Sequence, residues 1–214
     1  MRGISKIFLG LGALALALLP SGCGKPEEGL SMTAYERIQK NLVEMKSYQA
    51  EAAVTYISNK NRNEYQTFQQ CRSTGEYRVA VTAPENLSGN ITVSDGSTIS
   101  QFNPKVSGKV SVTSKEMSER LEIFVTSFVK NYLNSEQAAV ENAEEDGVSC
   151  TALSAKIPGE NHYLSAEKLW VSNESHKPVK LVVYDREGGE RILVKFSNFE
   201  YNVNIDDSVF TVGG

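Results

Sequence analysis

The side chains able to do covalent or metal chemistry are few in this chain, which holds three cysteines and two histidines in 214 residues. His162 and His176 both fall in predicted turns, and neither has a second ligand at the spacing that a zinc site requires. The sequence contains no HExxH, CxxC or GxSxG motif, no P-loop and no dinucleotide-binding fingerprint. We therefore expect no catalytic residue, no metal site and no cofactor, and a protein that is not an enzyme.

The N-terminal segment has the three parts of a secretory signal peptide. Arg2 and Lys6 supply positive charge, Ile7–Leu19 is apolar, and residues 20–22 form a cleavage zone. The apolar run is about 13 residues long, whereas a helix that spans the hydrocarbon of a bilayer needs about 20. We predict that residues 1–22 are a signal peptide and not a permanent membrane span.

Cys23 directly follows the small residues Ser21 and Gly22, an order that resembles the bacterial lipobox. In a lipobox the thiol is joined to diacylglycerol, the peptide is cut before the cysteine, and the cysteine becomes the new N-terminus. Pro20 stands where leucine is most usual. This order predicts a membrane lipoprotein that carries acyl chains such as palmitate. Such chains hold a protein on the membrane because each buried CH₂ contributes about 0.8 kcal/mol. The alternative is an ordinary secretory peptide in which Cys23 is incidental.

The other two cysteines, Cys71 and Cys150, are an even pair in a chain expected outside the cytoplasm, where disulfides persist. One interpretation is a disulfide that closes a loop of about 80 residues. The other is two buried free thiols. The sequence leaves both open.

The charge of the chain argues against nucleic acid as a partner. There are 22 basic and 26 acidic residues, and removal of Arg2 and Lys6 with the signal peptide moves the net charge from −4 to −6. Nucleic-acid binding depends on clustered Lys and Arg, and no such cluster is present. The acidic run within residues 141–146 is predicted to be a solvated helix face and loop, and not a catalytic or Ca²⁺ cluster.

Hydrophobic periodicity predicts the elements that surround these residues. A capping box of Thr33 and Glu36 begins a first helix, and a second box of Thr113 and Glu116 begins a helix that runs to Asn134. A shorter acidic helix is predicted over residues 135–145. Strands are predicted over residues 48–56, 64–72, 76–83, 90–94, 98–102, 109–112, 148–157, 164–172, 179–185 and 191–201.

That order of elements predicts an α+β fold, in which one large antiparallel sheet carries the helices on one face. Residues 23–30 are polar and glycine-bearing and are expected to form a lipidated tether. Residues 31–214 are expected to form a single domain. An apolar sheet face under helices either packs solid or leaves a groove for a lipid or peptide, and periodicity does not separate these two states.

Four stretches of the C-terminal third, Leu169–Val171, His176–Leu181, Ile192–Phe199 and Val203–Phe210, resemble the LolA-like family of periplasmic lipoprotein carriers and their lipoprotein relatives. In that family the Trp strand, the Pro-Val-Lys strand and the terminal Asp-Asp-x-x-Phe segment lie in order on a strongly curved half-barrel. The resemblance implies that helices cover the concave face of this half-barrel. It also implies one candidate function, a carrier or binder of lipid or lipoprotein acyl chains at the cell envelope.

Residues 41–52 and the segment from Gln69 to Asn90, with the Cys23 start, resemble the GerS-type germination lipoproteins of spore-forming clostridia. This resemblance implies a non-enzymatic lipoprotein on the forespore-envelope side, which binds and supports the cortex N-acetylmuramoyl-L-alanine amidase. Muramic-δ-lactam would then be made and the cortex degraded at germination. A structural envelope lipoprotein without a specific activity stays open as a further interpretation. The free edges of a half-barrel also allow a homodimer by strand or helix exchange.

Overall fold

Antiparallel strands dominate the part of the chain that the computed structural model describes, residues 32–106, 109–113, 121–159 and 161–211. The elements, in chain order, are α1 (Ala34–Val43), β1 (Ser47–Ile57), β2 (Arg62–Arg72), β3 (Tyr77–Ala83), β4 (Ile91–Ser94), β5 (Thr98–Phe102), β6 (Lys109–Thr113), the 3₁₀ turn η1 (Leu121–Ile123), α2 (Val125–Asn134), β7 (Ala139–Glu145), β8 (Val148–Lys156), β9 (Ala166–Ser172), β10 (Pro178–Tyr184), β11 (Glu190–Tyr201) and the 3₁₀ turn η2 (Asp207–Phe210).

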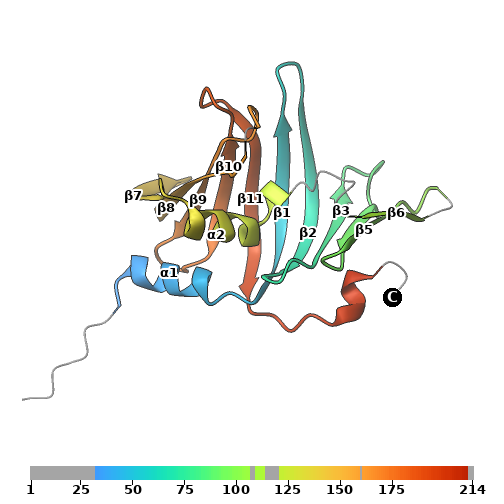
Figure 1. The fold of residues 1–214 in the computed structure, drawn as a ribbon, viewed down its shortest axis with the longest axis horizontal. Helices are drawn as coiled ribbons and strands as arrows, with labels where there is room; N and C mark the ends of the chain where they lie inside the picture. The colour runs from blue at the N-terminus through green and yellow to red at the C-terminus, as the bar shows by residue number, and fades with distance from the viewer. Residues whose placement is uncertain (1–31, 107–108, 114–120, 160, 212–214) are drawn as a thin grey trace, which may run out of the picture. The chain divides into compact units, whose positions relative to one another are not determined.

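The described strands form one open, 11-stranded antiparallel sheet in the order β6-β5-β4-β3-β2-β1-β11-β10-β9-β8-β7 (Figure 1). Every neighbouring pair is consecutive in the chain except β1 and β11, which join the two halves of the sheet. All ten predicted strands are present, with ends within two residues of the prediction. The α+β fold class, a large curved antiparallel sheet with helices on its concave face, is confirmed.

The prediction of an acidic helix over residues 135–145 is wrong, because this segment contains the edge strand β7. Every residue of β7 pairs with β8, from Ala139 opposite Ser154 to Glu145 opposite Val148. The turn between them is Asp146-Gly147, with φ values of 50° and 81°. Asp-Gly is a strong signal for a two-residue hairpin whose central residues have positive φ angles, and here it outweighs the high helix propensity of the alanines and glutamates before it.

The first helix begins as predicted. The Glu36 amide donates to Thr33 Oγ1 at 3.2 Å, and the Thr33 amide donates to Glu36 Oε2 at 2.7 Å, which completes the capping box. The second helix is shorter than predicted in the described residues, since α2 begins only at Val125, after η1. Thr113 ends β6, and Glu116 lies outside the described residues, so the second capping box stays a prediction.

The face of the sheet that packs against α1 and α2, here called the inner face, carries the main core. One row of directly paired residues crosses five strands of this face and is fully buried: Leu153, Leu169, Leu181, Val194 and Val54. The helices add Ile38, Leu42 and Phe128 to the same cluster, all at most 4% exposed. Each such side chain stabilises the fold by roughly 1.5–3 kcal/mol. Around these residues the inner face under α1 and α2 is therefore packed solid.

A bulge in β11 curves the sheet where its two halves meet. The register of β1 and β11 shifts between Gln49 and Glu51, and Asn198 in the bulge has a φ of 49°. The extra residue turns Phe199 to the inner face, where its ring stacks on Tyr48 with centroids 4.9 Å apart. Bulges of this kind increase local twist and bend the strand, so this one helps the sheet to curve around its helices.

One acidic side chain, Glu167 on β9, is buried on the inner face and only 1% exposed. Asn131 of α2 donates to Glu167 Oε1 at 2.8 Å, while Oε2 has no hydrogen-bond partner among the described residues. Burial raises the pKa of Glu167 to about 7, and the hydrogen bond from Asn131 only partly opposes this rise. The folded protein therefore holds this carboxyl largely protonated in mild acid.

This raised pKa predicts a stability that falls as the pH rises. Below the unfolded pKa of about 4.5 the favourable protonation is fully present, and it is lost as pH passes through the folded pKa of about 7. Urea unfolding should show a decrease on the order of 2–3 kcal/mol from Glu167 between pH 5 and pH 8. Glu167→Gln should abolish most of that decrease and leave the protein more stable than the parent at pH 8. Glu174→Gln, an exposed change in the β9–β10 turn, is the matched control. A parental pH slope in Glu167→Gln would contradict the assignment.

Candidate functional site

Cys71 and Cys150 are both buried and both free, so the disulfide between them is not formed. Cys71 lies on β2 and faces the inner core, whereas Cys150 lies on β8 and faces the opposite, outer face. Four strands separate β2 from β8 in the sheet, a distance of roughly 24 Å, and a disulfide needs Cα atoms within about 7 Å. The structure has the two free thiols that the sequence also allowed. Burial raises the pKa of Cys71 to about 12, which makes this thiol unreactive.

Cys23, the predicted lipidation residue, lies outside the described residues, and its acylation stays a prediction. Neither helix in the described part of the chain is long and apolar enough to cross a bilayer.

The two histidines do not meet. His162 Nε2 lies 3.1 Å from Glu187 Oε2 at the surface, and His176 occupies a turn with a φ of 55°. Among residues 32–106, 109–113, 121–159 and 161–211, no group of three or more His, Cys, Asp or Glu side chains could hold a metal ion.

The acidic run that was predicted as a helix face instead neutralises lysines of the outer face. The pairs are Lys168 with Glu141, Lys180 with Glu145 at 2.5 Å, and Lys195 with Asp146 at 2.8 Å. They cross from the β7–β8 hairpin to β9, β10 and β11. Each carboxylate in these pairs therefore faces an ammonium group, which is an arrangement for holding strands together and not for binding Ca²⁺.

Trp170 is the centre of this outer face. Its ring lies under two of the same lysines, with Lys180 Nζ 4.2 Å and Lys168 Nζ 5.1 Å from the ring centroid. The ring packs with Cys150, Ala152 and Val182 in a small cluster separate from the main core. Cation–π contact and burial both stabilise this arrangement, so Trp170 is a structural residue of the outer face.

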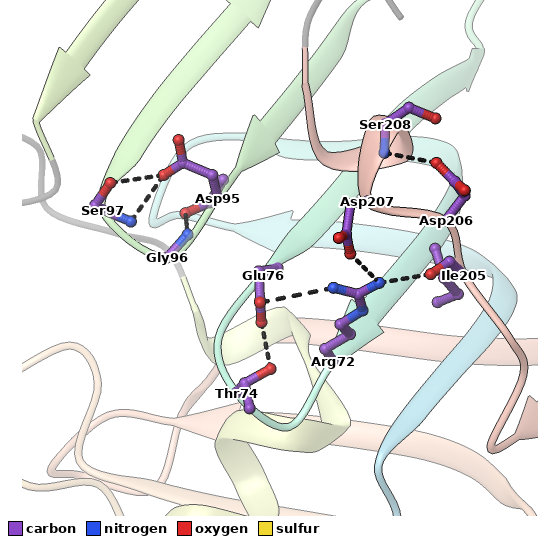
Figure 2. Close-up of polar contacts among 11 residues, drawn as sticks. Arg72, Thr74, Glu76, Asp95, Gly96, Ser97, Ile205, Asp206, Asp207 and Ser208 are labelled. Carbon is purple, nitrogen blue, oxygen red and sulfur yellow. Dashed lines mark hydrogen bonds and ion pairs between the residues drawn. The ribbon is translucent and has the colours of Figure 1, made fainter.

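Arg72, at the end of β2, connects the C-terminal segment to the sheet (Figure 2). Its Nη2 donates to the Ile205 carbonyl at 2.5 Å and lies 2.7 Å from Asp207 Oδ1, and its guanidinium lies over the Phe210 ring at 4.7 Å. Glu76, across the β2–β3 turn, adds a longer ion pair of 3.7 Å. Three different contacts on one side chain thus hold the segment 203–211 against the end of the sheet.

Further hydrogen bonds hold the segment 203–211 in the conformation that contacts Arg72. Asp206 caps η2, because its Oδ1 accepts from the Ser208 amide at 2.9 Å, and that hydrogen bonding lowers the pKa of Asp206. Upstream, Ser47 Oγ donates to the Val203 carbonyl at 2.6 Å and so joins the segment to the start of β1. No pattern in the sequence singled out Arg72. The Asp-Asp-x-x-Phe segment was recognised only through family resemblance, and a lone arginine in a strand carries no comparable signal.

Comparison with known proteins gives a family and several related structures. Residues 10–210 match the family model described as sporulation protein YdcC-like. No curated protein matches the chain in a sequence search.

Among solved structures, one match is a chain in the structure of the CwlD amidase from Clostridioides difficile in complex with the GerS lipoprotein. The identity is 32%, over 78% of this chain and 94% of that one, with a TM-score of 0.50. An uncharacterized conserved protein from Thermus thermophilus matches at 15% identity over 83% and 90%, with a TM-score of 0.52. The LolA superfamily protein NE2245 from Nitrosomonas europaea matches at 16% identity over 85% and 98%, with a TM-score of 0.43.

The described residues thus define an open half-barrel of the α+β class, with polar networks that hold structure together and with no cluster able to hold a metal. Its relatives include a structure of a lipoprotein bound to an enzyme. The chain belongs to the YdcC-like family of sporulation proteins.

The Arg72 contacts predict a local change in stability. Arg72→Met should lower the free energy of unfolding by roughly 2 kcal/mol, because it removes a charge-assisted hydrogen bond to a backbone carbonyl and an ion pair. Amide hydrogen exchange by mass spectrometry should then be faster in the peptide that covers residues 203–211.

Asp207→Asn is the matched control for that change. Asp207 is 91% exposed, so loss of its charge should change stability by less than about 1 kcal/mol and should leave exchange in the segment near the parental rate. Equal effects of the two substitutions would show that the exposed ion pair, and not the guanidinium as a whole, holds the segment.

Proposed function

We propose that this protein is a non-enzymatic, membrane-anchored lipoprotein of spore formers that binds and supports the cortex N-acetylmuramoyl-L-alanine amidase. The amidase would then act on cortex peptidoglycan, muramic-δ-lactam would be made, and the cortex could be degraded at germination. The anchor is the acylated Cys23, on the forespore-envelope side of the membrane. A homodimer formed by exchange of a strand or a helix between two copies is compatible with this role, and the molar mass of the complex would show whether it forms.

One observation carries this proposal, the 32% identity to a chain in the structure of the CwlD amidase with the GerS lipoprotein. That structure contains one enzyme and one lipoprotein. The lipobox-like order before Cys23 and the lack of a metal-holding cluster in the described residues fit the lipoprotein. Membership of a family of sporulation proteins supports a role in spore formers.

The fold is suited to act on an enzyme by binding it. A solid inner core makes the sheet rigid, and a rigid partner that binds only the active conformation of an enzyme shifts the population toward that conformation. The solid packing under α1 and α2 also supports this role over that of an acyl-chain carrier, which needs an apolar space at that place.

The direct test is co-purification with the cortex amidase of the same organism. We expect the two proteins to co-elute in size-exclusion chromatography, and the amidase to cleave spore peptidoglycan faster in the mixture than alone. At a lipoprotein concentration of about 100 times the dissociation constant, binding should stabilise the amidase by roughly 2.7 kcal/mol, seen as a higher unfolding midpoint. A vegetative cell-wall amidase of the same organism is the control and should show neither effect. Absence of co-elution together with unchanged cleavage would refute the proposal.

The anchor has a test of its own. Cys23→Ala should move the protein from the membrane fraction to the soluble fraction and abolish incorporation of labelled palmitate, with no change in the unfolding midpoint. Cys150→Ala, which removes a different thiol, should leave both the fractionation and the label unchanged. Palmitate label that persists in Cys23→Ala would show that Cys23 is not the acylated residue.

A further inference from the structure

A cavity of about 730 Å³ opens where the inner face extends beyond α2, at the β1–β2 turn. Tyr56 and Ile192, which pair across β1 and β11, lie at its base on the sheet. The β1–β2 turn and the loop before β9 form the sides. The lining residues are Tyr56, Ile57, Ser58, Asn59, Lys60, Asn61, Asn63, Glu122, Asn161, Tyr163, Leu164, Arg191 and Ile192. Its volume is within the usual range for small-ligand sites.

Amide groups and aromatic rings line this wall beside aliphatic and charged side chains. Four asparagines line it, and each side-chain amide can both donate and accept hydrogen bonds. The wall charges are of both signs, since Lys60 and Arg191 are accompanied by Glu122. An apolar chain would leave the amides without partners, at a cost of about 1–3 kcal/mol for each buried group. A neutral ligand rich in hydroxyl and amide groups matches the wall better.

Arg191, Asn59 and the β1–β2 turn are held in place before any ligand binds. Arg191 makes two bonds to Asp185, Nε at 2.6 Å and Nη2 at 2.5 Å, and its Nη1 donates to Asn59 Oδ1 at 2.8 Å. Burial alone would raise the pKa of Asp185, but its hydrogen bonds from the Gly189 amide and from Arg191 lower that pKa, so the carboxylate stays charged. Ser58 holds the turn itself, because its amide donates to the Asn61 carbonyl at 2.9 Å. A preorganised wall of this kind loses little conformational entropy on binding.

Tyr163 is held in place and yet exposed. Its amide donates to Asn161 Oδ1 at 2.9 Å, and the Arg191 guanidinium lies 5.3 Å from its ring centroid. The side chain nevertheless remains 56% exposed at the edge of the cavity. A large aromatic ring kept at the surface beside amides is a stacking surface for the apolar face of a sugar ring.

We propose that this cavity binds a glycan strand of N-acetylated amino sugars, with Tyr163 stacking on a sugar ring and the asparagine amides bonding its hydroxyl and acetamido groups. The choice of amino sugars rests on the proposed function, since peptidoglycan is the substrate of the amidase that the protein would support. The lipoprotein thereby holds the polymer as well as the enzyme that acts on it.

The test uses isothermal titration calorimetry with the full mature protein in detergent. The probes are chitotetraose, a chain of four N-acetylglucosamines, and cellotetraose, which has the same linkage without acetamido groups. We expect chitotetraose to bind and cellotetraose to bind at least about tenfold more weakly. Tyr163→Ala should weaken chitotetraose binding roughly tenfold, as truncation of an interfacial tyrosine commonly does. Asn61→Ala should weaken it by a smaller factor.

Phe102→Ala is the matched control, because Phe102 is also an exposed aromatic side chain but lies on β5, away from the cavity. It should leave chitotetraose binding unchanged. No binding of chitotetraose at millimolar concentration, equal binding of the two sugars, or parental affinity in Tyr163→Ala would each overturn the glycan site. If the protein does not bind chitotetraose but still co-elutes with the amidase, the glycan site is wrong and the proposed function stands. If it binds chitotetraose but does not co-elute with the amidase, the proposed function is wrong and the glycan site stands.

Discussion

The pairing of β1 with β11 is the constraint on which the rest of the structure depends. All other neighbours in the sheet follow one another in the chain and need only a turn between them, but β1 and β11 are separated by most of the domain. Until they pair, the chain consists of two separate meanders, β1–β6 and β7–β11. Their union places the two halves of the main core side by side, and it brings α1 and the segment after β11 to the same end of the sheet (Figure 1). The bulge at Asn198 and the Tyr48–Phe199 stack lie within this pairing, so the curvature of the sheet is set at the same place.

Local signals in the sequence were sufficient for most of the fold, since alternation and turn residues placed ten strands within two residues of their ends. The failure at β7 is instructive, because residues 135–145 have a helix-prone composition and only the following Asp146-Gly147 turn indicates a strand. The lysines that neutralise this strand lie on β9, β10 and β11, and no short-range pattern could connect them to it. The bulge at Asn198 was equally hidden, since its effect is to place Phe196 and Phe199, three residues apart, on the same face.

The same limit applies to the sites. The sequence contains none of the common catalytic motifs, and no motif could place Cys71 and Cys150 on opposite faces of a sheet, because the face of each residue depends on the register of strands far apart in the chain. The contacts of Arg72 and the cavity around Tyr163 are formed by turns and by segments more than 100 residues apart in the chain. No short sequence motif predicts such sites. They are visible only once the β1–β11 pairing brings β2 beside the C-terminal segment and the β1–β2 turn beside Arg191.

The positions of these sites along β1 fit the proposed anchor. The β2–β3 turn lies at the start of β1, because the Ser73 amide donates to the Lys46 carbonyl, and Figure 1 shows α1 at this end of the sheet. The cavity lies at the other end of β1, which at about 3.4 Å per residue is more than 30 Å away. With Cys23 acylated as proposed, the chain from Cys23 to Ala34 reaches at most about 40 Å from the membrane. On that proposal the chain would enter the domain through α1, at the Arg72 end of the strands, and the amide-lined cavity would lie at the opposite end of the sheet. A glycan strand of the envelope would be met at that end, and repulsion between an acidic domain and an anionic bilayer would keep the sheet off the membrane surface.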